Sequence, residues 1–190
     1  MRLKQGGLCE EFVKEGSGKM FNYRPLTEED AKEYRHIRLE ALKNAPEAFA
    51  TSYKEEQHVP VEEFGLRLKG EGATTFGVFH TTELVAVVTL LFEQKQKLQH
   101  RAMLVAMYVH PDYQRKGIGR KLLQYPIQFA KSNDDIEQLY LTVVSTNVQA
   151  KKLYESLGFR CYGVDKRALK LASGMYLDED LMVLDLKMST

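Results

Sequence analysis

The sequence contains few cysteines, and the two present form no pattern. Cys9 and Cys161 are far apart in a chain of 190 residues, and neither has the CxxC or Cys/His spacing of a zinc or redox site. A disulfide-stapled miniprotein is therefore excluded, and a reducing cytoplasm is the expected location. The five histidines are scattered without ligand spacing, so we expect no metal.

An excess of charge of either sign is absent as well. Lysine and arginine number 27 against 26 for aspartate and glutamate, which leaves a formal net charge of +1. No field of the whole molecule would draw the chain to nucleic acid or to acidic lipid, so any electrostatic recognition must be local. We therefore expect no nucleic-acid partner and no membrane partner.

Long apolar runs are also missing. The longest, 84–92, is interrupted by Thr89 and falls far short of the ~20 residues that cross a bilayer. Residues 1–19 lack the apolar centre of a secretory signal, and their glycines and mixed charges are typical of a flexible leader. The remaining length suffices for one sizeable core, so we expect a single folded domain over residues 20–190.

Hydrophobic periodicity predicts a mixture of helices and strands in this domain. Thr27 and Asp30 have the spacing of a capping pair before a helix that Asn44 and Pro46 end. Pro126 lies inside another helical stretch, where it should remove a hydrogen bond and kink or interrupt the helix unless packing compensates. In chain order we expect strands at 22–26, 74–80, 84–92, 101–109, 137–144, 159–171 and 181–187, and helices that begin near 31, 60, 118 and 147.

The most informative segment joins a buried strand to a glycine-rich helix start. It reads Val109-His-Pro-Asp-Tyr-Gln-Arg-Lys-Gly-Ile-Gly-Arg120. Free amides at a helix start form an anion site, and Gly117 and Gly119 carry no Cβ atom that would hold a phosphate away. A Rossmann fingerprint would need glycine at Leu122, and the P-loop order is absent. A glycine-rich helix cap with solvated cations is the simpler interpretation.

The order of strand, Gln-x-x-Gly-x-Gly and helix, with Gln114 as its first residue, resembles the pyrophosphate loop of the GNAT superfamily of acyl-CoA N-acyltransferases. A second family landmark follows in order: the strand 137–144, then Asn147-Val-Gln-Ala-Lys-Lys-Leu-Tyr154-Glu-Ser-Leu-Gly-Phe159. The resemblance extends over about residues 21–187. It implies an α/β fold with a mixed, largely antiparallel central sheet flanked by helices, in which one pair of strands splays apart at the acetyl-CoA site.

The resemblance also implies which residues bind the cofactor. The strand before the loop would offer backbone hydrogen bonds to the pantetheine arm, which by position implicates Met107, Tyr108 and Val109. A peptide-like pantetheine can pair with an open strand edge, as an added strand does. The pyrophosphate would lie on backbone amides of Gln114, Arg115, Lys116, Gly117, Ile118, Gly119 and Arg120. Asn147 would contact the cofactor arm, and it is also suited to cap the following helix.

Tyr154 is the expected catalytic residue, by the same resemblance. A phenol with a pKa near ~10 can give a proton to a departing thiolate. The ring is equally suited to pack on Phe159, because a glycine-terminated helix brings the next residue back onto its last turn.

A general base is harder to place, because the strand 101–109 contains no carboxylate. Glu55, Glu56, Glu93 and Glu179 are candidates, each also suited to a solvated surface, and a water relay is a further route. Cys161 is expected to be a small buried residue and not an acyl carrier, because the family transfers the acyl group directly.

These patterns favour an N-acetyltransferase in which a neutral primary amine attacks the thioester of the cosubstrate acetyl-CoA. A noncatalytic CoA-binding sensor or interaction domain is the alternative. A nucleic-acid module that uses the loop cations is disfavoured by the near-zero net charge. The acceptor is expected to be a small-molecule or peptide amine, and the last hairpin could pair two subunits into a homodimer.

Overall fold

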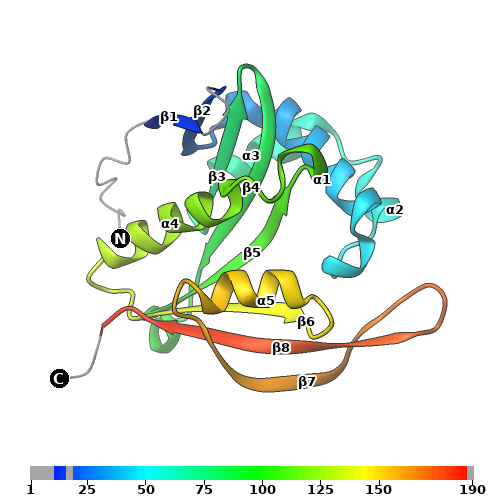
Figure 1. Ribbon diagram of the computed structural model, residues 1–190, viewed down its shortest axis with the longest axis vertical. Helices are drawn as coiled ribbons and strands as arrows, with labels where there is room; N and C mark the ends of the chain where they lie inside the picture. Colours follow the sequence, from blue (N-terminus) through cyan, green and yellow to red (C-terminus); the bar gives the residue numbers. More distant parts are fainter. Residues whose placement is uncertain (1–10, 16–18, 188–190) are drawn as a thin grey trace.

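The computed structural model describes residues 11–15 and 19–187, and its centre is a sheet of eight strands in the order β1-β2-β3-β4-β5-β6-β8-β7 (Figure 1). The strands are β1 (Glu11–Glu15), β2 (Lys19–Pro25), β3 (Ala73–His80), β4 (Glu83–Phe92), β5 (Arg101–Val109), β6 (Gln138–Val144), β7 (Arg160–Lys170) and β8 (Tyr176–Asp185). The helices are α1 (Ala31–Asn44), α2 (Tyr53–Glu56), α3 (Val61–Lys69), α4 (Ile118–Lys131) and α5 (Val148–Glu155).

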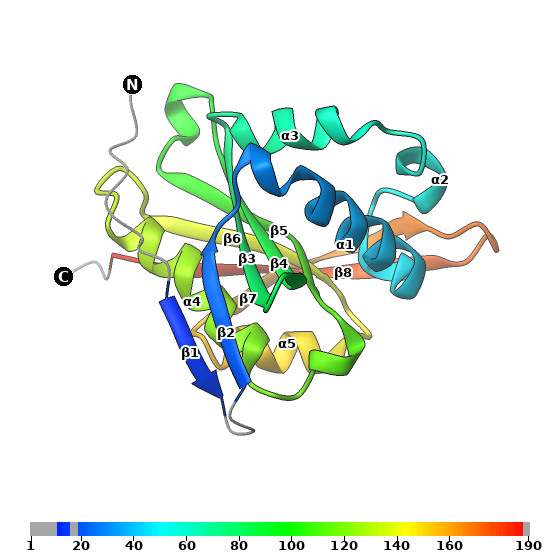
Figure 2. The ribbon, with the colours of Figure 1, turned by 90° about the horizontal axis from the view of Figure 1, so that it is seen from above.

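Helices cover both faces of the sheet. Figure 2 shows α1 and α3 on one side and α4 and α5 on the other. Ile37 and Phe64 anchor the core under α1 and α3, and Leu122, Leu123 and Leu139 anchor the core under α4 and α5. The predicted α/β class and flanking helices are confirmed.

The strands β5 and β6 part within the sheet. Their pairing is parallel and covers only Arg101–Met103 against Gln138–Tyr140, although β5 continues to Val109 and β6 to Val144 (Figure 1). The other described strand pairs are antiparallel. Ala106 has a φ of 54° at a register shift between β4 and β5, and such a bulge bends and twists its strand. The expected splayed pair is thus present.

Local signals placed most elements correctly. Thr27 and Asp30 form the predicted capping box, and β5 has the predicted bounds. Pro126 is buried inside α4, and the helix continues through it to Lys131. The short helix α2 was not expected; Ser52 and Glu55 form its own capping box. None of the helices in the described ranges is long and apolar enough to span a bilayer.

The expectation of a flexible leader up to residue 19 is wrong for residues 11–15, which form β1 and pair antiparallel with β2. Glu11 accepts hydrogen bonds from the Tyr125 hydroxyl and from Lys121 Nζ, the latter at 3.0 Å. The open edge of β2 and two donors on α4 therefore hold this strand, and composition alone does not reveal them. The rest of the expected leader lies outside the described residues, except Lys19, the first residue of β2.

The expectation of a buried Cys161 is wrong as well. Its side chain is exposed, because β7 is the edge strand of the sheet and most of its residues face solvent. Cys9 lies outside the described residues.

Docking of β1 on α4 can be tested by a double-mutant cycle on Glu11 and Tyr125. Tyr125→Phe keeps the ring, which stacks on Tyr23 at 5.4 Å, and removes only the hydroxyl that bonds Glu11. We expect Tyr125→Phe and Glu11→Gln each to lower the free energy of unfolding by about 0.5–1 kcal/mol, with a double variant less destabilised than their sum.

The coupling should also depend on pH. The Tyr125 hydroxyl, and then Lys121, lowers the pKa of Glu11, so the stabilisation is present above the ordinary carboxyl pKa and fades as acid protonates Glu11. Chemical denaturation at pH 7 and pH 3 measures it. Strictly additive effects at pH 7 would show that β1 does not dock on α4.

Candidate functional site

The open edge of β5 is the centre of the candidate site. Met107 and Val109 pack against the core under α4 and α5, whereas Tyr108 is buried on the face that α1 covers. Both faces of the strand end are thus occupied by packed side chains, as the core interpretation predicted. What remains for a ligand is the backbone along the edge that has lost β6.

The loop after β5 presents a second set of backbone groups. Arg115 and Gly117 have φ values of 58° and 84°, and Gly117 is the N-cap of α4. The first intrahelical bond of α4 runs from the Lys121 amide to the Gly117 carbonyl at 3.1 Å, so the amides before it have no partner within the helix. A Cβ built at Gly117 would meet nothing within 4 Å. The helix start is therefore open to an anion.

Gly119 has a packing role in addition to the one expected. A Cβ at this position would lie 3.3 Å from Met107 Cε and 3.4 Å from Val109 Cγ2, so the missing side chain allows α4 to approach β5 closely. Ile118 is also part of the core, at 1% exposure. The side chains at these two positions serve packing, and only their amides remain for ligand binding.

Several polar side chains of the loop hold it in shape. Gln114 Nε2 donates to the Val109 carbonyl at 3.0 Å, and Lys116 Nζ donates to the Asp112 carbonyl. Arg120 Nη1 lies 3.4 Å from the Ser156 carbonyl and links the start of α4 to the end of α5. Arg115 is exposed. The positive charge at the loop is thus anchored close to its amides.

Tyr154 lies on α5 with its ring in the core under α4 and α5, at 8% exposure. Its ring packs edge-on against Phe159 at 6.0 Å, and the Phe159 amide donates to the Tyr154 carbonyl, so the predicted packing is confirmed. Burial raises the pKa of Tyr154 to about 12, so its hydroxyl stays protonated at neutral pH. Within the described residues its hydroxyl has no hydrogen-bond partner.

Asn147 caps α5. Its Oδ1 accepts a hydrogen bond from the Ala150 amide at 3.1 Å, which confirms the capping interpretation, and the side chain is exposed.

Sequence reasoning missed a polar cluster where α1 meets the end of β5. The Tyr108 hydroxyl donates to Glu40 Oε1 at 2.8 Å and accepts from Asn44 Nδ2 at 3.1 Å. His110 Nε2 lies 3.6 Å from the same Glu40 oxygen, and its Nδ1 accepts from the Asp112 amide. Burial is the main cause that raises the pKa of Tyr108 to about 12. A spacing of four residues puts Glu40 and Asn44 on one face of a helix, but no pattern in the sequence identifies Tyr108 as their partner.

The carboxylates proposed as general bases lie in different surroundings. Glu55 caps α2 and Glu93 is exposed, whereas Glu56 is buried between two arginines. Glu179 of β8 is half-buried and pairs in register with Val144 of β6, and burial raises the pKa of this carboxyl. Across the described ranges, His, Cys, Asp and Glu form no group that could hold a metal ion.

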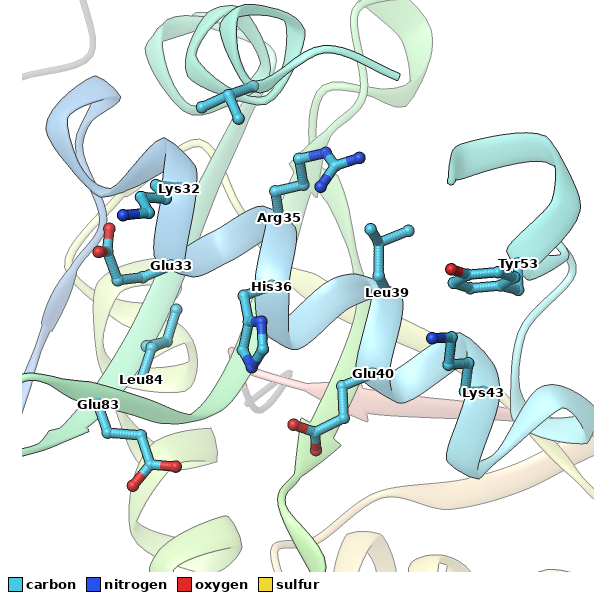
Figure 3. Close-up of a pocket in the computed structure, with 11 residues that line it drawn as sticks. Lys32, Glu33, Arg35, His36, Leu39, Glu40, Lys43, Tyr53, Glu83 and Leu84 are labelled. Atoms are coloured by element: carbon cyan, nitrogen blue, oxygen red, sulfur yellow. The ribbon is translucent and has the colours of Figure 1, made fainter. Parts of the chain in front are cut away.

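A hollow of about 620 Å³ runs along the outer side of α1 (Figure 3). Figure 3 shows His36 and Glu40 extending from one side of this helix, and Lys43 beside the ring of Tyr53. The residues that line the hollow carry both positive and negative charges, and none of them is expected to bind the cofactor. Glu40 lines this hollow and also accepts the hydrogen bond from the Tyr108 hydroxyl.

A sequence profile of the acetyltransferase (GNAT) family matches residues 31–159. Among curated proteins, the ribosomal protein bS18-alanine N-acetyltransferase of Salmonella typhimurium is 34% identical over 98 residues, which are 52% of this chain and 64% of that protein. N-alpha-acetyltransferase 30 of Xenopus laevis is 35% identical over 98 residues, 47% of this chain and 36% of that protein. The match therefore spans less than two thirds of either relative.

Solved structures share the fold over almost their whole length. A putative acetyltransferase from Salmonella typhimurium, determined with its cofactor acetyl-CoA, has a TM-score of 0.77 at 20% identity, covering 90% of this chain and 96% of that one. The ribosomal-protein-S18-alanine N-acetyltransferase from Escherichia coli has a TM-score of 0.68 at 26% identity, covering 90% and 97%.

The raised pKa of Tyr154 predicts a specific loss of stability in alkali. A phenol whose pKa is higher in the folded state stabilises the fold fully below its unfolded pKa near ~10, and this contribution is lost as the pH rises toward 12. Between pH 9 and 11 the parent should lose about 1 kcal/mol more unfolding free energy than Tyr154→Phe.

Urea denaturation at the two pH values measures this difference. Tyr162→Phe, which removes an exposed hydroxyl on β7, should lose as much stability as the parent. Equal losses in the parent and Tyr154→Phe would contradict the burial of this hydroxyl.

Proposed function

Because the chain belongs to the acetyltransferase (GNAT) family, we propose that it is an N-acetyltransferase that moves an acetyl group from acetyl-CoA to a primary amine. The observation that carries the proposal is the parting of β5 from β6 directly before a loop of unpaired amides at the start of α4. This combination provides a strand edge for a peptide-like arm and an anion site for a pyrophosphate in one continuous segment.

The fit of acetyl-CoA to these residues can be followed group by group. Beyond Met103, the edge of β5 has lost β6, so backbone groups of Met107, Tyr108 and Val109 would pair with the amides of pantetheine. The Val109 carbonyl already accepts a hydrogen bond from Gln114 Nε2, so pantetheine would share or replace that donor. The amides of residues 115–120 would bind the pyrophosphate, in the open space that Gly117 leaves, whereas the Gln114 amide already donates to the Pro111 carbonyl at 3.2 Å. Packed side chains on both faces of β5 keep this edge rigid.

Acyl transfer needs orientation and one proton donor. Acetyl-CoA supplies an activated thioester; a neutral amine attacks its carbonyl carbon, the C–N bond forms, and the C–S bond breaks. The Tyr154 hydroxyl, which is protonated at neutral pH, would donate to the sulfur as negative charge develops there. The amine gives its proton to solvent, and solvent returns a proton to the Tyr154 oxygen, so the products are an amide and free CoA.

The acceptor belongs to the same proposal. The two curated relatives are named as a ribosomal protein bS18-alanine N-acetyltransferase and an N-alpha-acetyltransferase, so an amino terminus is one candidate beside small-molecule amines. Release of free CoA from acetyl-CoA across a panel of peptides, amino acids and polyamines tests the proposal. CoA binding without turnover of any amine would favour the noncatalytic sensor instead.

Gly117→Val should weaken acetyl-CoA binding at least about tenfold, because its side chain would enter the space assigned to the pyrophosphate. Gly174→Val is a matched control: Gly174 has a φ of 86° beside 84° for Gly117, and neither position has a neighbour within 4 Å. Both variants carry the same backbone strain, so calorimetric titration with acetyl-CoA isolates the site. Equal affinities of the two folded variants for acetyl-CoA would show that the loop is not part of the binding site.

Tyr154→Phe should lower kcat by about 10²- to 10⁴-fold, the usual range for a lost general acid. The ring keeps its contact with Phe159, so thermal stability near neutral pH and acetyl-CoA affinity should change little. The control is Tyr125→Phe, which removes a buried hydroxyl of α4 on the side of β1. The rate must be measured at saturating acetyl-CoA across pH; a near-parental kcat would leave solvent as the proton donor.

A further inference from the structure

A second cavity, of about 360 Å³, lies between α1, α2 and α3 and the strands β3, β4 and β5. Its lining residues are Tyr34, Arg38, Glu56, Arg67, Gly70, Gly72, Ala73, Thr75, Thr89, Leu91, Val105 and Ala106. Ala106 is the bulged residue of β5 and directly precedes the segment assigned to pantetheine. The cavity therefore reaches the strand beside which the thioester is proposed to lie.

The charged wall of this cavity comes from three residues. Glu56, at 7% exposure, accepts hydrogen bonds from Arg38 Nε at 3.1 Å and from Arg67 Nη1 at 3.2 Å. Arg38 Nη2 lies 3.5 Å from Glu56 Oε1, the same oxygen that accepts the hydrogen bond from Arg67. Both carboxylate oxygens are thus engaged, so Glu56 orients the two arginines and is poorly suited to serve as a base.

The two arginines keep donors to spare. A guanidinium has five N–H groups, and the contacts with Glu56 occupy only part of those on Arg38 and Arg67. Aromatic rings support both groups: Arg38 lies 5.0 Å from the centre of Phe49, and Arg67 lies 4.7 Å from that of Phe64. The guanidinium groups are therefore held in place for a further acceptor.

The remaining walls offer no compensation for the positive charge. The Thr75 and Thr89 hydroxyls bond each other at 2.8 Å, and Leu91 and Val105 are apolar. Among the described lining residues, two arginines face one glutamate, which leaves one positive charge in excess in a partly buried setting. A ligand with an acidic group would balance this charge, whereas a polyamine would add to it.

We propose that this cavity binds the acceptor of the acetyl group, an inference that rests on the proposed acetyl transfer. The acceptor is then a small amine with a carboxylate of its own, such as an amino acid. Arg38 and Arg67 would hold the carboxylate, and the amine would face Ala106 at the open edge of β5. The volume lies at the lower end of the range for small-molecule sites, which suits an acceptor of this size. An acceptor without an acidic group would leave the excess positive charge of the two arginines unbalanced.

Matched pairs of acceptors test the charge requirement. The common α-amino acids and β-alanine are each compared with their carboxamides, together with spermidine and an uncharged dipeptide amide, by CoA release from acetyl-CoA. We expect kcat/KM to be at least about tenfold higher for the best free acid than for its carboxamide. Equal or better use of the carboxamides, spermidine or the peptide would overturn the assignment while leaving acetyl transfer intact.

Variants separate recognition from packing. Arg67 is the more exposed arginine, with 45% of its side chain accessible, so Arg67→Gln should fold and should abolish the preference for the free acid through a raised KM. Lys69, which lies on the same helix as Arg67, forms an exposed ion pair with Glu28. Lys69→Gln should leave kcat/KM unchanged for both the free acid and its carboxamide. An equal loss for acid and carboxamide with a lower melting temperature would assign Arg67 a structural role and overturn the proposal.

Failure of acetyl transfer itself would be distinguishable. If no amine releases CoA, the CoA-saturated protein is titrated calorimetrically with the same acids and carboxamides. Binding of acids alone, lost in Arg67→Gln, would support the cavity as an acid site without turnover. Equal binding of acids and carboxamides, or binding of neither, would overturn the assignment of the cavity as an acid site.

Discussion

The short parallel contact between β5 and β6 is the constraint on which the candidate site depends. Only Arg101–Met103 and Gln138–Tyr140 pair, and beyond them the two strands diverge while each remains fixed by its other neighbour, β4 or β8. Unpaired backbone groups of a central strand are costly unless something bonds them. A fold that keeps such an edge open in its centre therefore has a strong physical reason to bind a ligand with peptide-like groups there.

Packing around β5 makes the open edge rigid. Met107 and Val109 face the core under α4, Tyr108 faces α1, and Gly119 allows α4 to lie directly against the strand. Glu40 and Asn44 then fix the Tyr108 hydroxyl from α1. Rigid support of this kind lowers the entropic cost of orienting a thioester toward an attacking amine.

Positive charge is concentrated at two places in the structure, the loop before α4 and the cavity under α1. In the loop before α4, cations are tied to backbone carbonyls beside unpaired amides, and in the cavity under α1, Glu56 aligns two arginines without neutralising both. A chain with a net charge of +1 thus presents two separate positive sites. We propose the first for the pyrophosphate of the donor and the second for an acidic group on the acceptor.

The sequence by itself determined the features that depend on neighbouring residues. The capping box of Thr27 and Asp30, the Asn147 cap and the return of Phe159 onto Tyr154 were all predicted, because each links groups only a few residues apart. The bounds of β5 and its glycine-rich loop followed from the same local patterns.

Only the tertiary structure decided which distant side chains meet. It docked β1 on β2 and α4, exposed Cys161 on an edge strand, and placed Glu56 between Arg38 and Arg67. Such contacts depend on how helices cross the sheet and on which strand edges stay open. Their partners come from separate segments of the chain, so hydrophobic periodicity and motif spacing carry no signal for them.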